Sequence, residues 1–341
     1  MAATFQNAVL TGACGGLGQA LARELIGQGA AVALVGLHLP TLQALAALAP
    51  GRCAVYTPDV SDSIAMQAMA ADWMARSGAV PDLVIANAGV AGGFDTAEAD
   101  DLAVLRRMLE INLLGAATTF QPFVKAMRAQ RRGALVGVAS IAGWRGMPGN
   151  GAYCASKGGL IRYLESLRAE LRGESIVVST VSPGYLRTAL TAGNRFAMPG
   201  LMEPEAAARA LLAGVAQGRT HIVLPARIGW LARLLNLLPD ALHDRLLLGQ
   251  PRKPRVGEAG ATAIPGLPVL LNQTSCCGLI IVVKAPFKTI IILCSLACLL
   301  ANCKRSILLG EGPNRRSNSF GCGVIMLFGG NLLSHERLCD N

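Results

Sequence analysis

Tyr153 and Lys157 have the spacing most suggestive of chemistry, because residues four apart in a helix share one face. An ammonium beside a phenol lowers the phenol's pKa from about 10 toward neutrality, so the phenol can exchange a proton near neutral pH. Ser140, at the end of an earlier apolar run, is placed to hydrogen-bond a substrate oxygen and polarise it as charge develops. These three side chains suit proton transfer to a carbonyl oxygen or from an alcohol.

Asn112 is a fourth candidate catalytic residue. It falls on the apolar stripe of a predicted helix that includes Leu105 and Leu109, where a buried amide needs hydrogen-bond partners. Two roles remain open at this point. Asn112 caps a local backbone kink, or it holds a water that relays protons to Lys157.

A glycine-rich turn follows the first apolar run and predicts a dinucleotide site. The chain reads Thr-Gly-Ala-Cys-Gly-Gly-Leu-Gly over 11–18 and then continues as a helix. Glycines let the backbone approach a pyrophosphate, and the helix N-terminus favours its charge. The predicted contacts are Gly12, Gly16, Leu17 and Gly18. A glycine-rich turn without a ligand is the alternative interpretation.

Two short segments after the third and fourth predicted strands extend this site. Asp59 and Val60 follow the third strand, and Asn87-Ala88-Gly89 ends the fourth. Ligands of open α/β sheets collect at these carboxyl ends. Asp59 either accepts a hydrogen bond from an adenine amino group or serves as a helix N-cap.

The end of the second predicted strand bears on the choice of cofactor. It reads Val-Gly-Leu-His over 35–38, without a carboxylate, Arg or Lys. A missing carboxylate removes a repulsion against a 2′-phosphate, so NADP is favoured slightly over NAD, and both remain open. His38 is interpreted as a phosphate contact or as a surface residue without a role.

These residues require a particular set of elements to position them. Apolar β-branched runs alternate with helical patterns up to about residue 255, which indicates a doubly wound parallel seven-stranded sheet of the Rossmann type over 1–255. The predicted strands lie near 7–11, 31–35, 53–57, 83–87, 134–139, 177–182 and 221–224.

Residues 256–341 have a different character. A Gly/Pro/Ala-rich linker to about Pro268 leads into an extension with seven of the ten cysteines. Beyond the adjacent pair Cys276-Cys277, these cysteines show no metal-type spacing. The membrane-span candidate, Leu279 to Ala301, is interrupted by Lys284, Pro286 and Lys288. A single membrane-spanning helix, a peripheral hairpin and an extension without a catalytic role all stay open.

Composition excludes several classes of protein. Hydrophobic residues make up 52% and charged residues 15%, which argues against general disorder. The net charge of +10 is scattered through amphipathic helices without aromatic platforms, so we expect no nucleic-acid partner. The N-terminus lacks the pattern of a secretory signal, which leads us to expect a cytoplasmic protein, and we expect no metal site.

Taken together, these motifs resemble the short-chain dehydrogenase/reductase family over about residues 5–250. The resemblance rests on Thr-Gly-x3-Gly-x-Gly, Asn-Ala-Gly, Asn112, Ser140, Tyr-x3-Lys and the pair Pro183-Gly184 in one order. It implies an Asn-Ser-Tyr-Lys tetrad, with Lys157 also binding ribose hydroxyls and Thr188 binding the nicotinamide carboxamide. Pro183 and Gly184 belong to that cofactor site. A homodimer or homotetramer with long helices in contact is implied as well.

The substrate is predicted only by class. Apolar candidates for the pocket wall suggest a small, lipophilic ketone or secondary alcohol: Trp144, Met147, Phe196, Met198 and Leu201. The apolar, arginine-containing segment 227–248 packs on the domain or a second subunit, or lies on a membrane surface.

Three functions compete at this stage. The first is a reversible carbonyl/alcohol oxidoreductase with Tyr153 as general acid and base. The second is a catalytically silent dinucleotide-binding or regulatory protein, against which the intact Ser140, Tyr153 and Lys157 argue. The third is a membrane-associated protein whose altered tail prevents folding or assembly.

Overall fold

The structure is a computed structural model, which describes residues 5–194, 197–250, 252–258, 261 and 263–267 in full. Four further strands between 278 and 335 are described by their backbone alone. The chain divides into two compact units, residues 1–269 and 270–341.

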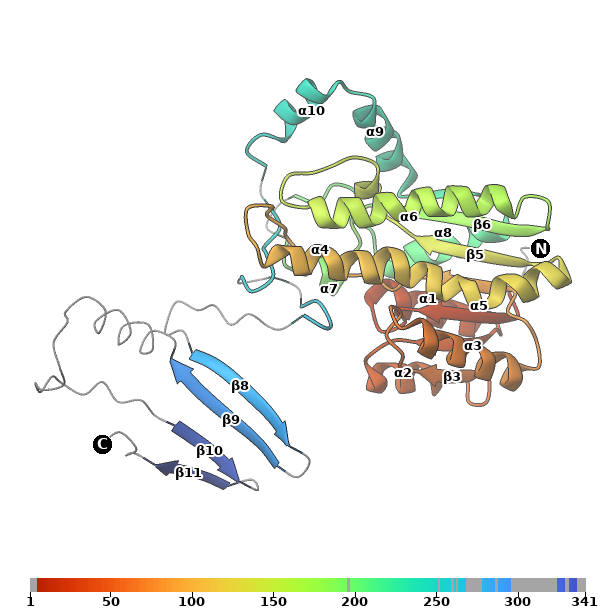
Figure 1. Cartoon of the computed structure of the whole chain (residues 1–341). Coiled ribbons are helices and arrows are strands. Elements are labelled where there is room, and N and C mark those ends of the chain that lie inside the picture. The colour runs from red at the N-terminus through yellow and green to blue at the C-terminus, as the bar shows by residue number, and fades with distance from the viewer. Residues whose placement is uncertain are drawn as a thin grey trace, which may run out of the picture. The chain divides into compact units, whose positions relative to one another are not determined.

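Seven parallel strands form the sheet of the first unit in the order β3-β2-β1-β4-β5-β6-β7. Figure 1 shows this sheet among its flanking helices. The order reverses between β1 and β4, which opens a crevice at the carboxyl ends of these two strands. The predicted doubly wound sheet is confirmed, with every strand end within one residue of its prediction. The strands are β1 Asn7–Thr11, β2 Ala31–Val35, β3 Cys53–Tyr56, β4 Leu83–Ala86, β5 Gly133–Val138, β6 Ile176–Pro183 and β7 His221–Leu224.

Helices cover both faces of this sheet. They are α1 Gly16–Gly27, α2 Leu39–Ala46, α3 Ser63–Ser77, α4 Asp101–Leu109, α5 Gly115–Gln130, α6 Gly151–Glu170, α7 Ala189–Ala192, α8 Pro204–Ala216, α9 Ala226–Asn236 and α10 Asp240–Leu247. A π-helical turn, Glu110–Leu114, joins α4 to α5, and a short 3-10 turn, Ile141–Gly143, follows β5.

The alternation of strand side chains divides the core into two layers. Leu10 points into a cluster with α1, α2 and α8, whereas the preceding Val9 points into a cluster with α3, α4, α5 and α6. Phe120 and Phe123 of α5 are fully buried in the second cluster. Burying one such side chain contributes roughly 1.5–3 kcal/mol. The strands therefore lie between two apolar layers, which hold their carboxyl ends in position.

Helix α6 carries two of the predicted catalytic residues, Tyr153 and Lys157. Its stripe of Leu160, Leu164 and Leu167 is buried against the sheet, as predicted. The stripe begins about two turns after Tyr153, so the turns that carry Tyr153 and Lys157 directly precede it in the same helix. The packing of this helix thereby sets the position of Tyr153 and Lys157.

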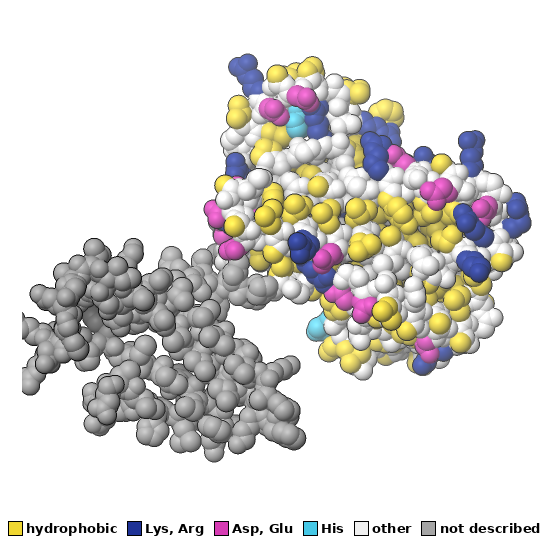
Figure 2. All heavy atoms as spheres, in the orientation of Figure 1, with side chains coloured by type: hydrophobic (Ala, Val, Ile, Leu, Met, Phe, Trp, Pro, Cys, Tyr) yellow, Lys and Arg dark blue, Asp and Glu magenta, His cyan; other side chains and the backbone are white. Residues whose placement is uncertain are grey.

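Helices α9 and α10 expose much of their apolar surface (Figure 2). The side chain of Arg145 donates to the carbonyl oxygens of Leu235, Asn236 and Leu238 and pairs with Asp240 at 2.7 Å. One arginine from the loop after β5 therefore holds the corner between the two helices. Their large exposed side chains are Trp230, Leu231, Leu234, Leu235, Leu237, Leu242, Leu246 and Leu248.

Residues 252–267, predicted to begin a linker, pack on the first unit where they are described. Gly93 forms a parallel bridge with Arg255, and its N–H donates to the Pro254 carbonyl at 2.9 Å. Ile264 is 4% exposed and joins the cluster that contains Met108 of α4. We call residues 252–267 the strap.

The second unit contains two antiparallel pairs of strands. β8 (Gly278–Ala285) pairs with β9 (Lys288–Ser295), and β10 (Val324–Phe328) pairs with β11 (Asn331–His335). The predicted membrane-span candidate thus contains two short strands instead of one continuous helix. Within the described residues, no helix has both the length and the apolar character needed to cross a bilayer. The seven tail cysteines lie outside the residues whose side chains are described.

Candidate functional site

The glycine-rich turn leaves no space for side chains. Gly12 has φ +66°, and a Cβ there would lie 2.7 Å from the Ala88 backbone. A Cβ on Gly18 would lie 2.0 Å from the Gly12 carbonyl oxygen. Helix α1 begins at Gly16 without a side-chain cap, and Leu17 buries its side chain in the core. Backbone N–H groups of this turn are therefore available to bind an anion.

Hydrogen bonds tie the end of β4 to the same turn. Thr11 Oγ1 accepts from the N–H groups of Asn87 at 3.2 Å and Ala88 at 3.3 Å. The Asn87 amide donates to the Thr11 and Gly12 carbonyls, both at 3.1 Å. The structure brings together Asn87, Ala88, Gly89 and the glycine turn. Sequence reasoning assigned no function to Thr11, although its place before Gly12 was the available signal.

His38 at the end of β2 acts as the N-cap of α2. Its Nδ1 lies 2.7 Å from Thr41 Oγ1 and accepts from the Thr41 N–H at 3.4 Å. The backbone N–H of His38 also donates to Cys14 Sγ at 3.4 Å. The exposed imidazole has a structural role in the turn that closes this end of the site.

Asp59 forms a polar cluster with residues far along the chain. Its carboxylate accepts from the backbone N–H of Ser61 at 2.9 Å and from the Ser61 hydroxyl at 2.7 Å, and it pairs with Arg107. Burial raises the pKa of Asp59, but these contacts outweigh burial and hold it below its ordinary value. The N-cap of α3 is Asp62, so the N-cap interpretation of Asp59 was wrong. No sequence motif indicated Arg107.

Val60 supports the neighbouring backbone. Its side chain is buried against Gly115, where a Cβ would lie 2.7 Å from Val60 Cγ2. Its carbonyl oxygen accepts a hydrogen bond from the Thr118 hydroxyl. These contacts join the end of β3 to the start of α5.

Asn112 lies in the π-helical turn and is 1% exposed. Its Oδ1 accepts from the Val90 N–H at 2.8 Å, and its Nδ2 donates to the Val90 carbonyl and to Ser156 Oγ, both at 2.9 Å. The amide thus holds the loop after β4 against α6. Sequence reasoning missed Ser156 as its partner, although Ser156 precedes Lys157 directly.

Ser140 and Tyr153 are linked by a hydrogen bond between their side chains. Ser140 Oγ also accepts from the Ala142 N–H at 3.1 Å and donates to the Pro183 carbonyl at 3.4 Å. The loop after β5 and the start of α6 therefore meet at these two hydroxyls.

Lys157 is 4% exposed, and its Nζ donates to the Val138 carbonyl at 2.8 Å. Burial lowers the pKa of Lys157 to about 8. Burial also raises the pKa of Tyr153, and the hydrogen bond with Ser140 only partly offsets this. The pKa of Tyr153 is therefore raised in this structure, whereas the sequence analysis expected Lys157 to lower it. A Cβ on Gly89 would lie 3.1 Å from Lys157 Nζ and 3.2 Å from Asn112 Oδ1, so both face this glycine.

The loop after β6 completes one wall of the crevice. The Gly184 N–H donates to the Leu224 carbonyl at 2.7 Å, which holds the segment that follows Pro183. Thr188 is the N-cap of α7. A Cβ on Gly16 would lie 2.6 Å from Thr188 Cγ2, so this loop reaches the glycine turn.

The predicted substrate-wall residues have separate surroundings. The Trp144 ring lies edge-on to His221 and under the guanidinium of Arg233. Met198 Sδ accepts from Asn194 Nδ2 at 3.5 Å. Met147 and Leu201 are half-buried, and Phe196 lies outside the described residues. The fully described residues include no cluster of three or more potential metal ligands.

Comparison with known proteins adds three similar chains. A family model described as short chain dehydrogenase matches residues 6–198. An uncharacterized oxidoreductase from Myxococcus xanthus is 37% identical over 71% of this chain and 96% of its own length.

Two solved structures carry bound dinucleotides. A short chain dehydrogenase from Burkholderia cenocepacia in complex with NADP has a TM-score of 0.61 at 27% identity, over 72% of this chain and 98% of that one. A 3-oxoacyl-[acyl-carrier protein] reductase from Brucella melitensis with bound NAD has a TM-score of 0.56 at 28% identity, over 64% of this chain and 89% of that one.

Proposed function

Because the chain belongs to the short-chain dehydrogenase family and is an NAD(P)-dependent oxidoreductase, we propose that it interconverts a carbonyl group and a secondary alcohol. The hydrogen-bonded pair Ser140 and Tyr153 carries this proposal, together with Lys157, which lies one helical turn after Tyr153 in α6. Bound NAD(P) supplies the hydride in reduction and accepts it in oxidation.

Tyr153 donates the proton to the developing alkoxide in reduction and accepts it in oxidation. Ser140 hydrogen-bonds the same substrate oxygen, which stabilises charge as it grows. For this role the Ser140 hydroxyl turns from the Pro183 carbonyl, to which its bond is long at 3.4 Å. The phenol is most useful when its pKa approaches the working pH.

Lys157 has two roles in the proposal. One N–H of its ammonium is engaged by Val138, and the other two remain for the ribose hydroxyls of the cofactor. Its positive charge lowers the pKa of Tyr153 once the ammonium turns toward the phenol. Asn112 Oδ1 faces Gly89 together with Lys157 Nζ, so its second lone pair can hold a water on the proton route.

The cofactor lies along the crevice at the carboxyl ends of β1 and β4 in this proposal. Backbone groups of the glycine turn bind the pyrophosphate, Asp59 and Val60 bind the adenine end, and Asn87-Ala88-Gly89 line the floor. Pro183, Gly184 and Thr188 hold the nicotinamide end. The absence of Cβ atoms at Gly12, Gly16 and Gly18, together with the uncapped start of α1, supports this placement.

We propose NADP as the preferred cofactor. No carboxylate stands at the turn after β2, so no negative charge repels a 2′-phosphate there. His38 caps α2 through its imidazole, which places a polar ring at the same turn.

Parallel fluorescence titrations of the full chain with NADH and NADPH test the cofactor site and its preference. We expect saturable binding of both, with tighter binding of NADPH. Binding of both cofactors without oxidation by any ketone would favour the catalytically silent protein. Tighter binding of NADH would overturn the proposed preference.

The proposed substrate has an apolar body. Half-buried Trp144 and Met147 lie in the loop after β5, a few residues beyond Ser140, and half-buried Leu201 lies between α7 and α8. Hydride transfer between apolar walls also keeps water from the reacting carbon.

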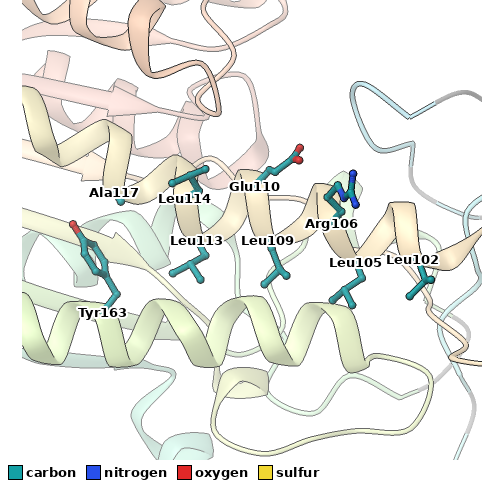
Figure 3. Close-up of a pocket in the computed structure, with 9 residues that line it drawn as sticks. All are labelled: Leu102, Leu105, Arg106, Leu109, Glu110, Leu113, Leu114, Ala117 and Tyr163. Carbon is teal, nitrogen blue, oxygen red and sulfur yellow. The ribbon is translucent and has the colours of Figure 1, made fainter.

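A second copy of the chain is the proposed partner. The groove between α4, the π-helical turn and α6 is lined mainly by leucines, with Tyr163 at one end (Figure 3). Leu102 is 60% exposed and Leu114 is 50% exposed on this face. We expect L102E/L114E to convert a dimer to a monomer in light scattering, whereas L48E, at a residue also 50% exposed, leaves the dimer intact. A dimer that survives the double substitution would exclude this face.

A further inference from the structure

A half-buried lysine of the strap, Lys253, contacts the short helix α7 that follows Thr188. Lys253 Nζ donates to the Leu190 carbonyl of α7 at 3.0 Å. An ammonium has three N–H donors, so this contact leaves two. Lys253 forms no ion pair with any carboxylate among the described residues. A partly desolvated ammonium without a counter-charge is costly unless a ligand supplies one.

The strap brings Lys253 to the substrate side of the crevice. A Cβ on Gly93 would lie 2.2 Å from the Lys253 carbonyl oxygen, so the two backbones are in direct contact. The next residue, Phe94, donates its N–H to the Gly149 carbonyl at 3.0 Å, and its ring lies against Gly151. Gly151 begins α6 two residues before Tyr153.

The backbone carbonyl of Leu190 holds the ammonium end of the Lys253 side chain. Leu190 lies two residues after Thr188, the predicted nicotinamide contact. The ammonium therefore lies against α7, which follows Thr188, while the Lys253 backbone lies against Gly93. The proposed substrate, whose carbonyl reaches Ser140 and Tyr153, lies next to the nicotinamide end that Thr188 is proposed to hold.

The acidic side chains near the strap are already paired with its arginines. Arg252 pairs with Asp95 at 3.5 Å. Arg255 pairs with Asp101 at 2.9 Å and with Glu98 at 3.6 Å. No titratable residue occurs in α7 or in the Pro-Gly-Asn-Gly loop over 148–151. Among the described residues, no carboxylate pairs with Lys253.

We propose that the substrate carries an anionic group and that Lys253 binds this group. This inference rests on the proposed carbonyl chemistry and specifies its substrate class. The body of the substrate is apolar, and its anionic end lies under the strap. A carboxylate and a phosphate monoester present the same chemistry to an ammonium.

Matched ketone probes test the inference on the full chain. The probes are para-acetylbenzoate and a medium-chain keto acid, each with its methyl ester, and para-acetylphenyl phosphate. Calorimetric titration into the complex with oxidised NADP, which cannot reduce a ketone, measures dissociation constants without heat from turnover. We expect an anionic probe to bind about 10- to 100-fold more tightly than its neutral counterpart, as is typical of a hydrogen-bonded charge.

Variants assign this preference to Lys253. K253M should remove most of the preference for anionic over neutral probes. K253R should keep most of this preference, because the positive charge remains. R252M is the matched control, since it removes the neighbouring cation, whose partner is Asp95, and should leave the preference in place. Equal binding of anions and esters by the wild type, or an unchanged preference in K253M, would overturn the inference. Stronger binding of the phosphate than of the carboxylates would support it and identify the anion.

The pH dependence provides a second readout. Burial lowers the pKa of Lys253 to about 8, so the anion preference should fade as the pH rises through that value. Burial lowers the pKa of Lys157 to a similar value, so K253M, which keeps Lys157, is titrated in parallel and should lack this pH dependence. Turnover of any ketone, compared with Y153F, tests the carbonyl chemistry separately, so failure of the reaction and failure of the anion subsite are distinguishable.

Discussion

The half of the sheet from β4 to β7, here called the catalytic half, holds the proposed catalytic side chains in a buried network. The half from β1 to β3, here called the nucleotide half, leaves exposed the turn after β2 that we propose selects the cofactor. Asn112, Lys157 and Ser140 are 1%, 4% and 8% exposed. Leu37, beside His38 at the end of β2, is 53% exposed. A buried polar network tolerates few substitutions, because each loss leaves another group unsatisfied. The reaction type is therefore constrained more tightly than the choice of cofactor.

The largest expected effect separates the chemistry of the catalytic half from dinucleotide binding. Y153F removes the proposed proton donor and keeps the ring, so kcat should fall about 100- to 10,000-fold. The dissociation constant for NADPH should change little. Single-turnover kinetics and fluorescence titration measure the two effects. A variant with wild-type turnover would exclude Tyr153 as the general acid.

The next effect concerns the strap that packs on the catalytic half. R255A leaves the Asp101 carboxylate, which is 3% exposed, without its guanidinium partner. Because Arg255 itself is 30% exposed, we expect a loss of about 2–3 kcal/mol in the free energy of unfolding. R187A is the control, since its pair with Glu203 is exposed at both side chains. Equal urea midpoints for the two variants would contradict a structural role for the strap.

A smaller effect is expected where the two halves meet. A Cβ in G16A would lie 2.6 Å from Thr188 Cγ2, so the nicotinamide loop must shift. We expect NADPH binding to weaken about 10-fold, which corresponds to roughly 1.4 kcal/mol. In G15A the new Cβ lies 3.5 Å from the nearest atom and should leave the affinity within about two-fold. Similar affinities for G16A and G15A would show that the loop adapts freely.

The smallest effect tests the exposed nucleotide half. H38A removes the cap of α2, so the free energy of unfolding should fall by about 0.5–1 kcal/mol. The ratio of NADPH to NADH affinity should change only a few-fold, because the ring is held by Thr41. H38N keeps a capping side chain and should restore stability. A large loss of NADPH affinity in both variants would assign phosphate binding to His38.

Local patterns were sufficient to predict the sheet and to select candidate side chains. Apolar runs placed all seven strands, because strands buried on both faces need continuous apolar sequence. The four-residue spacing of Tyr153 and Lys157 placed both on α6. Local composition was less informative over 256–268. The Gly/Pro/Ala-rich composition of this segment predicted a linker, but the structure buries Ile264 in the core.

Sequence alone determined the order of the strands along the chain, the glycine turn and the set of residues able to transfer a proton. Tertiary structure alone decided which distant groups meet: Arg107 with Asp59, Asn112 with Val90 and Ser156, and Lys253 with Leu190. Periodicity reports which face of an element is buried, but these contacts join elements that are distant in the sequence. They depend on how the helices and the strap pack over the sheet, and no local pattern encodes that packing.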